Sequence, residues 1–155
     1  MPIAPEGIVE ALQVSLSLHW TAVESYETQS VHFATWGYSK IAEEYAAAAE
    51  EERGHARKVM ARVEFFNTAP TTVHEFAIWT RHDYLAVLDQ NHEIETSAAD
   101  AERDGYVIAI DSGDAVTAGI FAELLADSEE AIQKIEAIRE VIGTIGLDNY
   151  LADKI

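Results

Sequence analysis

The hydrophobic and polar positions of this chain follow a helical period over nearly its whole length. Apolar or small side chains recur at alternating steps of three and four residues, a spacing typical of amphipathic α-helices. The pattern predicts four long helices, at about residues 5–36, 39–66, 81–110 and 115–142, and a short fifth helix within residues 146–154. The sequence shows no strand-like alternation, so the expected fold class is all-α.

Glycine, proline and aspartate separate the predicted helices. Gly37 marks a tight turn, so the first two helices should be antiparallel neighbours. Asp114 follows the break after the third helix and is a plausible N-cap for the fourth. Residues 71–80 have no clear period, and a connector of that length can cross the bundle. The prediction is a single domain, residues 1–155: an antiparallel four-helix bundle with a long crossover between helices two and three.

Polar side chains interrupt the apolar stripe of each long helix near its middle, where leucine would be expected. The first helix places His19 there, the second Glu52 and His55, and the third Glu95. On the fourth helix the interruption falls on Ser128 or Glu129. His92 precedes Glu95 by about one turn and lies on roughly the same face. An antiparallel bundle brings these four helix centres together.

This combination of residue types points to a metal site. Carboxylates in an apolar interior repel one another and lose hydration, unless a cation compensates them. Divalent iron, manganese or zinc accepts both glutamate oxygen and histidine nitrogen as ligands. Two other interpretations stay open: His19 can be a hydrogen-bonded core histidine, and the whole set can be buried His–Glu ion pairs without metal. His92 is expected on the flank of its helix, so it is a weaker candidate.

Composition narrows the function classes. Ten basic against 28 acidic residues give a net charge of −18, which argues against binding to nucleic acid and favours attraction of cations. The chain has no cysteine, so disulfides, thiolate zinc sites and cysteine nucleophiles are excluded. We expect a cytoplasmic protein, because the sequence also shows no signal peptide and no apolar run of membrane length.

Several stretches resemble the bacterioferritins, members of the ferritin-like superfamily. They are Trp36-Gly37, ERGHA at residues 52–56, RVEFF at 62–66 with Pro70, GLDNYL at 146–151 and the final Ile155. The resemblance implies a ferritin-like bundle and a homo-oligomeric hollow shell of 24 subunits, built from two-fold dimers. It also implies Fe(II) oxidation by dioxygen or peroxide, with storage of ferric mineral inside the shell.

The chain departs from the bacterioferritin pattern at the implied di-iron site. That pattern takes one glutamate each from helices one and three and an E-x-x-H motif from helices two and four. Here the resemblance implies one or two iron ions per subunit, one of them held by His19, Glu52, His55 and Glu95. Glu129 and His92, the weaker candidates from the helical pattern, could complete this position or a weaker second one. The second E-x-x-H falls on residues 128–131 and is lost. The haem methionine position is Arg53, so no haem with this ligation is expected.

Two alternatives to a ferroxidase shell remain open. The loss of the helix-four ligands favours a non-catalytic shell-forming subunit, which could mix with a second ferritin-like subunit. Leu18-His19-Trp20, with His32 about a dozen residues further on, is similar to the Dps group of mini-ferritins, which form 12-subunit shells with an iron site between subunits. The predicted fifth helix favours the bacterioferritin arrangement over the Dps arrangement.

Overall fold

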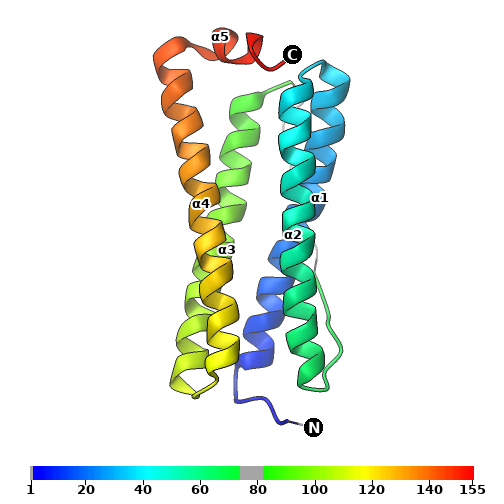
Figure 1. Ribbon diagram of the computed structural model, residues 1–155, viewed down its shortest axis with the longest axis vertical. Coiled ribbons are helices and arrows are strands. Elements are labelled where there is room, and N and C mark those ends of the chain that lie inside the picture. The colour runs from blue at the N-terminus through cyan, green and yellow to red at the C-terminus, as the bar shows by residue number, and fades with distance from the viewer. Residues whose placement is uncertain (1, 74–81) are drawn as a thin grey trace.

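The computed structural model describes residues 2–73 and 82–155 of the chain. It confirms the all-α prediction, with four long helices packed as two antiparallel pairs and a short helix at the C-terminal end (Figure 1). The helices are α1 (Ile8–Trp36), α2 (Ser39–Phe65), α3 (Tyr84–Asp111), α4 (Ala115–Ile145) and α5 (Leu147–Ala152). No helix in the described ranges is both long and apolar enough to cross a bilayer.

The connection between the two pairs spans the length of the bundle. Helix α2 ends and α3 begins at opposite ends of the molecule, which makes α2 and α3 parallel (Figure 1). This confirms the predicted long crossover. Most of the segment predicted to form it, residues 71–80, lies outside the described residues.

The observed helix boundaries differ from those predicted from periodicity, because local backbone conformation and capping decide where each helix starts and stops. The prediction of a first helical turn at Pro5 is wrong: Gly7 has a left-handed φ of 82°, and the helix begins at Ile8. Helix α3 begins at Tyr84 rather than near residue 81, because the Asp83 side chain accepts a hydrogen bond from the Ala86 amide and caps the helix. Helix α4 continues through Gly143 and stops where Gly146 takes a φ of 85°.

Two large apolar clusters fill the two ends of the bundle, and a small one of Ala22, Tyr26, Ala49 and Ile94 lies near its middle beside the polar groups. The Phe121 cluster lies toward the N-terminal end and comprises Ile8, Leu12, Leu16, Ala56, Val59, Val63, Phe66, Ala109, Ala118, Phe121 and Leu124. The Tyr84 cluster lies at the opposite end and comprises Phe33, Ile41, Ala42, Tyr84, Val87, Leu88, Ile135, Ile142, Tyr150 and Leu151. Helix α5 thus contributes two side chains to the core and lies across this end of the bundle (Figure 1).

Gly105 of α3 lies directly against the ring of Phe121. A Cβ atom at this position would lie 2.5–2.7 Å from three atoms of the fully buried Phe121 ring. Gly→Ala in a helix normally gains about 1 kcal/mol, but overpacking a core costs about 1–3 kcal/mol. We therefore expect Gly105→Ala to lower the free energy of unfolding, measured by urea denaturation.

The matched control is Gly119→Ala in α4, where an added Cβ meets no atom within 4 Å. This variant should gain up to about 1 kcal/mol from helix propensity alone. Equal stability of the two alanine variants would contradict the tight approach at Gly105.

Candidate metal centre

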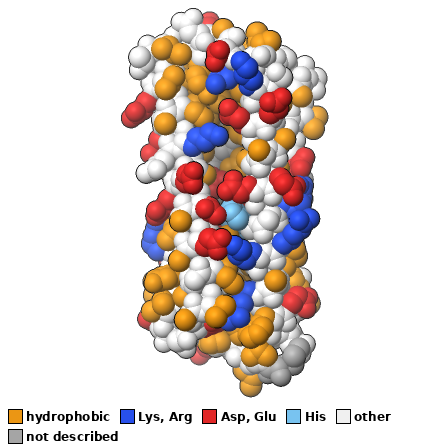
Figure 2. All heavy atoms as spheres, viewed as in Figure 1, with side chains coloured by type: hydrophobic (Ala, Val, Ile, Leu, Met, Phe, Trp, Pro, Cys, Tyr) orange, Lys and Arg blue, Asp and Glu red, His pale blue; other side chains and the backbone are white. Residues whose placement is uncertain are grey.

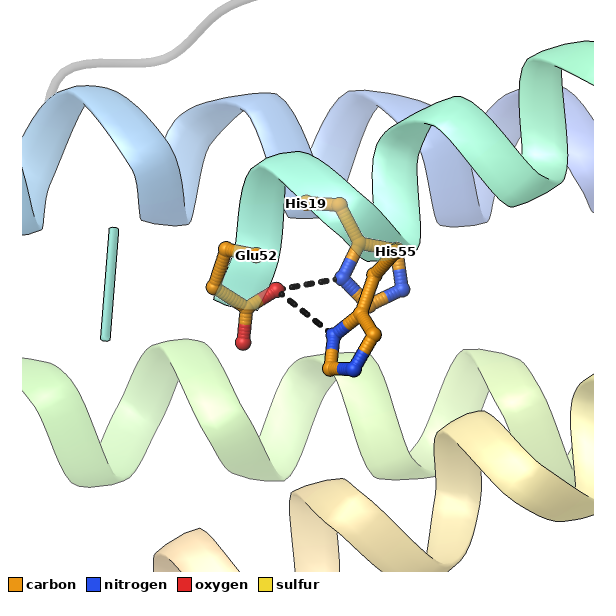
Figure 3. A group of neighbouring side chains, drawn as sticks. All are labelled: His19, Glu52 and His55. Carbon is orange, nitrogen blue, oxygen red and sulfur yellow. Dashed lines mark hydrogen bonds and ion pairs between the residues drawn. The ribbon is translucent and has the colours of Figure 1, made fainter. Parts of the chain in front are cut away.

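Three of the predicted ligands meet at the centre of the bundle. His19 projects from α1, and Glu52 and His55 lie one turn apart on α2 (Figure 3). Glu52 Oε2 lies 2.6 Å from His19 Nδ1 and 3.3 Å from His55 Nδ1, so both rings can donate to one carboxylate oxygen. All three side chains are buried, and one donor atom from each lies within 4.8 Å of the others. Such a set of one oxygen and two nitrogens can hold a divalent cation.

A second carboxylate, Glu102 of α3, faces His19 from the other side. Glu102 Oε1 lies 3.0 Å from His19 Nε2, an ion-pair distance without the angles of a hydrogen bond. The other oxygen, Oε2, accepts a hydrogen bond of 2.9 Å from the Ser128 hydroxyl. Glu102 is completely buried. The sequence prediction missed this residue as part of the site, although it lies on the same helical stripe as Glu95, two turns further along.

These contacts determine the protonation states of His19 and Glu52. Burial alone would lower the pKa of His19, but the carboxylates of Glu102 and Glu52 outweigh it and raise this pKa to about 10. Burial would raise the pKa of Glu52, but His19 and His55 outweigh it and lower this pKa to about 2. Without metal, His19 is therefore an imidazolium between two carboxylates and compensates their charge.

Glu95, the fourth predicted ligand, is buried nearby on α3 but holds a different partner. Its Oε1 accepts a hydrogen bond of 2.5 Å from the Tyr26 hydroxyl. Burial and the charge of Glu52 raise the pKa of Glu95 to about 8, because together they outweigh the Tyr26 hydrogen bond. Glu95 is thus a neutral acid at pH 7 in the metal-free site. The compact three-residue cluster of His19, Glu52 and His55 does not include it.

The two weaker candidates lie away from the cluster. The exposed Glu129 carboxylate lies 3.5 Å from an Arg103 guanidinium nitrogen. His92 Nε2 lies 3.2 Å from Glu136 Oε1, and both of these side chains face solvent. The structure therefore brings neither Glu129 nor His92 to the centre.

Asp127 of α4 is the second residue that the sequence prediction missed. Its Oδ2 lies 3.0 Å from His55 Nε2, and its side chain is 34% exposed. Its neighbour Ser128 occupies the buried stripe, so Asp127 lies one position toward solvent. Together with Glu51 and His55 it forms a second group of potential ligand atoms within 4.8 Å.

A pocket of about 500 Å³ opens between α2 and α4 and reaches the centre. Glu52, His55 and Glu95 line its inner part, and Glu51, Asp127 and Glu130 are among its other lining residues. Helices α2 and α4 touch at few points, whereas α1 packs closely on α2 and α3 on α4. Figure 2 shows acidic side chains gathered around a histidine midway along this face. The pocket therefore gives solvent cations a negatively charged route inward.

The α4 positions of the second E-x-x-H motif offer little to a metal ion at the centre. Ser128 is hydrogen-bonded to Glu102, and Ala131 has no ligand atom, so α4 supplies none of the donors that its lost motif would carry. Arg53 stands where the bacterioferritin pattern has its haem methionine, and its guanidinium pairs with Glu27 and Glu50. At the centre itself, His19, Glu52 and His55 form the group that could hold a metal ion, with Glu95 beside them.

The fold and the central carboxylate–imidazole cluster define a helical-bundle protein with a candidate metal centre between its helices. Comparison with known proteins identifies the family: residues 9–145 match the ferritin-like domain, and the chain belongs to this family. It is 28% identical to the bacterioferritin of Brucella melitensis biotype 1 over 143 residues, which are 92% of this chain and 89% of that protein.

Two further relatives are similar over nearly the whole chain. The bacterioferritin of Mycobacterium avium is 23% identical over 145 residues, 94% of this chain and 91% of its own. The bacterial ferritin of Neisseria gonorrhoeae is 27% identical over 147 residues, 94% of each chain. These matches confirm the resemblance to bacterioferritins inferred from the sequence motifs.

The stability of the metal-free protein should depend on pH through His19. The folded pKa of about 10 exceeds the ordinary value of 6.5, so the folded state keeps a proton that the unfolded chain releases. This stabilisation is complete below the unfolded pKa and is lost as pH rises through the folded pKa. The free energy of unfolding should therefore fall from about pH 7 to about pH 10, by up to about 1.4 kcal/mol per pH unit.

Urea unfolding of metal-free wild type and His19→Gln across this pH range measures the effect. The glutamine variant should show a flatter dependence, because it has no titrating ring. Equal slopes for the two proteins would show that His19 does not carry the extra proton.

Proposed function

We propose that this chain is an iron-storage subunit of the bacterioferritin type that binds Fe(II) at an altered, single-ion centre. The observation that carries the proposal is the buried cluster of His19, Glu52 and His55 inside a ferritin-like bundle. Glu95 lies beside this cluster, as a further ligand within the same pocket. In this proposal the protein is a homo-oligomer forming a hollow 24-subunit shell from two-fold dimers.

Two further observations support a bacterioferritin-like rather than a Dps-like assembly. The described chain ends in helix α5, packed against the bundle through Tyr150 and Leu151. His19, which stands in the Leu18-His19-Trp20 sequence similar to the Dps motif, is 1% exposed, and both of its ring nitrogens face carboxylates of its own chain. A histidine held in this way is not positioned for a site between subunits.

Iron is the substrate in this proposal, and the protein's part is to attract, bind and position it. The net charge of −18 and the acidic pocket favour Fe(II) over anions. Binding at His19 requires its imidazolium to release a proton, since only a neutral ring nitrogen can coordinate metal. Protons and Fe(II) therefore compete for His19, which predicts that Fe(II) binds more tightly at higher pH. Oxidation of bound Fe(II) by dioxygen or peroxide would complete the ferroxidase activity.

A second candidate function is a non-catalytic shell subunit, possible alone or alongside another ferritin-like chain. The specific observation in its favour is the internal charge balance, in which His19 already compensates Glu52 and Glu102. Residues 128 and 131 point the same way, because the Ser128 hydroxyl is bonded to Glu102 and Ala131 has no ligand atom, whereas paired-iron chemistry needs the helix-four donors. The rate of Fe(II) oxidation per bound ion distinguishes this candidate from the leading proposal.

Anaerobic Fe(II) titration tests the leading proposal. Wild type should bind about one Fe(II) per subunit with saturation, and Glu52→Ala should bind Fe(II) at least about tenfold more weakly, because Glu52 is the carboxylate shared by both histidines. Glu64→Ala is the matched control, an exposed glutamate on the same helix. Absence of saturable binding in wild type, or unchanged binding in Glu52→Ala, would rule out this centre.

Restoring the lost motif tests the reason for a single ion. The double variant Ser128→Glu with Ala131→His returns an E-x-x-H pair to α4, so Fe(II) stoichiometry should rise from about one to about two per subunit. Oxygen consumption during Fe(II) addition should accelerate in the variant. If stoichiometry stays at the wild-type value while the variant remains folded by circular dichroism, the missing α4 ligands are not what limits the site.

A further inference from the structure

The solvent side of His55 has its own set of ligand atoms. Oxygen atoms of Glu51 and Asp127 and a nitrogen of His55 all lie within 4.8 Å of one another. Asp127 reaches His55 Nε2 at 3.0 Å from α4, and Glu51 precedes Glu52 on α2. Glu51 and Asp127 stand at none of the six positions from which the bacterioferritin pattern draws its ligands. Glu51 and Asp127 are therefore potential ligands that the bacterioferritin pattern does not include.

The orientation of the His55 ring is the one that an outward-facing metal ligand needs. Its Nδ1 faces the Glu52 carboxylate at 3.3 Å, while its Nε2 points to Asp127. Metal-binding histidines usually donate the N–H of the nitrogen that does not bind metal to a carboxylate, which fixes the tautomer and orients the ring. Here Glu52 is that carboxylate, and His19 holds it in place from behind. In the metal-free protein the Nε2–H donates to Asp127, and an ion bound by Asp127 and Glu51 would take the place of this proton.

The surroundings supply the charge for a cation. Among the described residues that line the pocket, five carry carboxylates besides the neutral Glu95, and one, Lys134, carries an ammonium group. No ion pair is found for Glu51 or Glu130 in the described part of the chain. Asp127 is 34% exposed and His55 is 11% exposed at the side chain, so a hydrated ion reaches both without movement of the helices.

We propose that Glu51, His55 and Asp127 form a second, outer site for a transition-metal dication, at the mouth of the α2–α4 pocket. One imidazole nitrogen and two carboxylates suit Zn(II), Mn(II) or Fe(II), with the remaining positions filled by water. A neutral imidazole has a single lone pair, so His55 serves the inner or the outer ion but not both together. The outer site is the first that an incoming cation meets. This inference does not depend on iron oxidation.

Redox-inert Zn(II) is the probe, and Glu52→Gln isolates the outer site. The glutamine removes the inner carboxylate, yet its carbonyl oxygen can still accept the His55 Nδ1–H. Isothermal titration of the assembled Glu52→Gln protein should show one Zn(II) per subunit. Adding Asp127→Asn to this variant should weaken binding at least about 30-fold, because loss of an outer-shell partner alone costs about 10–100-fold and Asp127 would be a direct ligand. Adding Glu129→Gln instead removes a similar charge from the same helix, beside Arg103, and should change affinity less than about threefold.

Anomalous diffraction from Zn(II)-soaked crystals of Glu52→Gln locates the ion. A peak bonded to His55 Nε2 and Asp127 supports the outer site. Two results would overturn it: no Zn(II) binding by Glu52→Gln while wild type binds, or equal weakening by Asp127→Asn and Glu129→Gln. Both results leave the inner centre standing, whereas loss of Zn(II) binding in wild type as well would also remove the proposed function. Circular dichroism and the assembly size of each variant confirm that these losses do not come from misfolding.

Discussion

The arrangement of this molecule depends on how it compensates buried negative charge. Glu52 and Glu102 lie in the middle of a bundle whose two ends are apolar, and a bare carboxylate there would cost several kcal/mol. His19 lies between them, within ion-pair distance of both. Its position on α1, opposite α2 and α3, links three of the four long helices through charge. The polar middle therefore specifies how these helices align, while the apolar clusters supply most of the burial.

The same constraint explains how the site differs between metal-free and metal-bound states. A proton on His19 and a divalent cation at the cluster are alternative ways to satisfy the same carboxylates. Ser128 and Ala131 bring no charge to the face between α2 and α4, which touch at few points and leave a pocket between them. His55 lies at the inner part of this pocket and contacts Asp127 on its solvent side.

Periodicity in the sequence was enough to predict the bundle, the long crossover and the meeting of His19, Glu52 and His55. These features depend on which face a residue occupies, which the three- and four-residue steps determine. The helix ends were harder to predict from periodicity, because Gly7 acts through its backbone conformation and Asp83 through a capping hydrogen bond. Glu102 was missed for another reason: which carboxylate faces a given ring nitrogen depends on the relative height of α1 and α3. Asp127 sits beside the stripe rather than on it, so a strict pattern excludes it.

Helix α5 has a consequence for the order in which the chain can fold. Every member of the Phe121 cluster lies between Ile8 and Leu124, so that end of the core needs no residue of α5. The Tyr84 cluster also needs Tyr150 and Leu151, which follow the four long helices in the chain. One end of the bundle can therefore pack while the other still exposes aromatic surface.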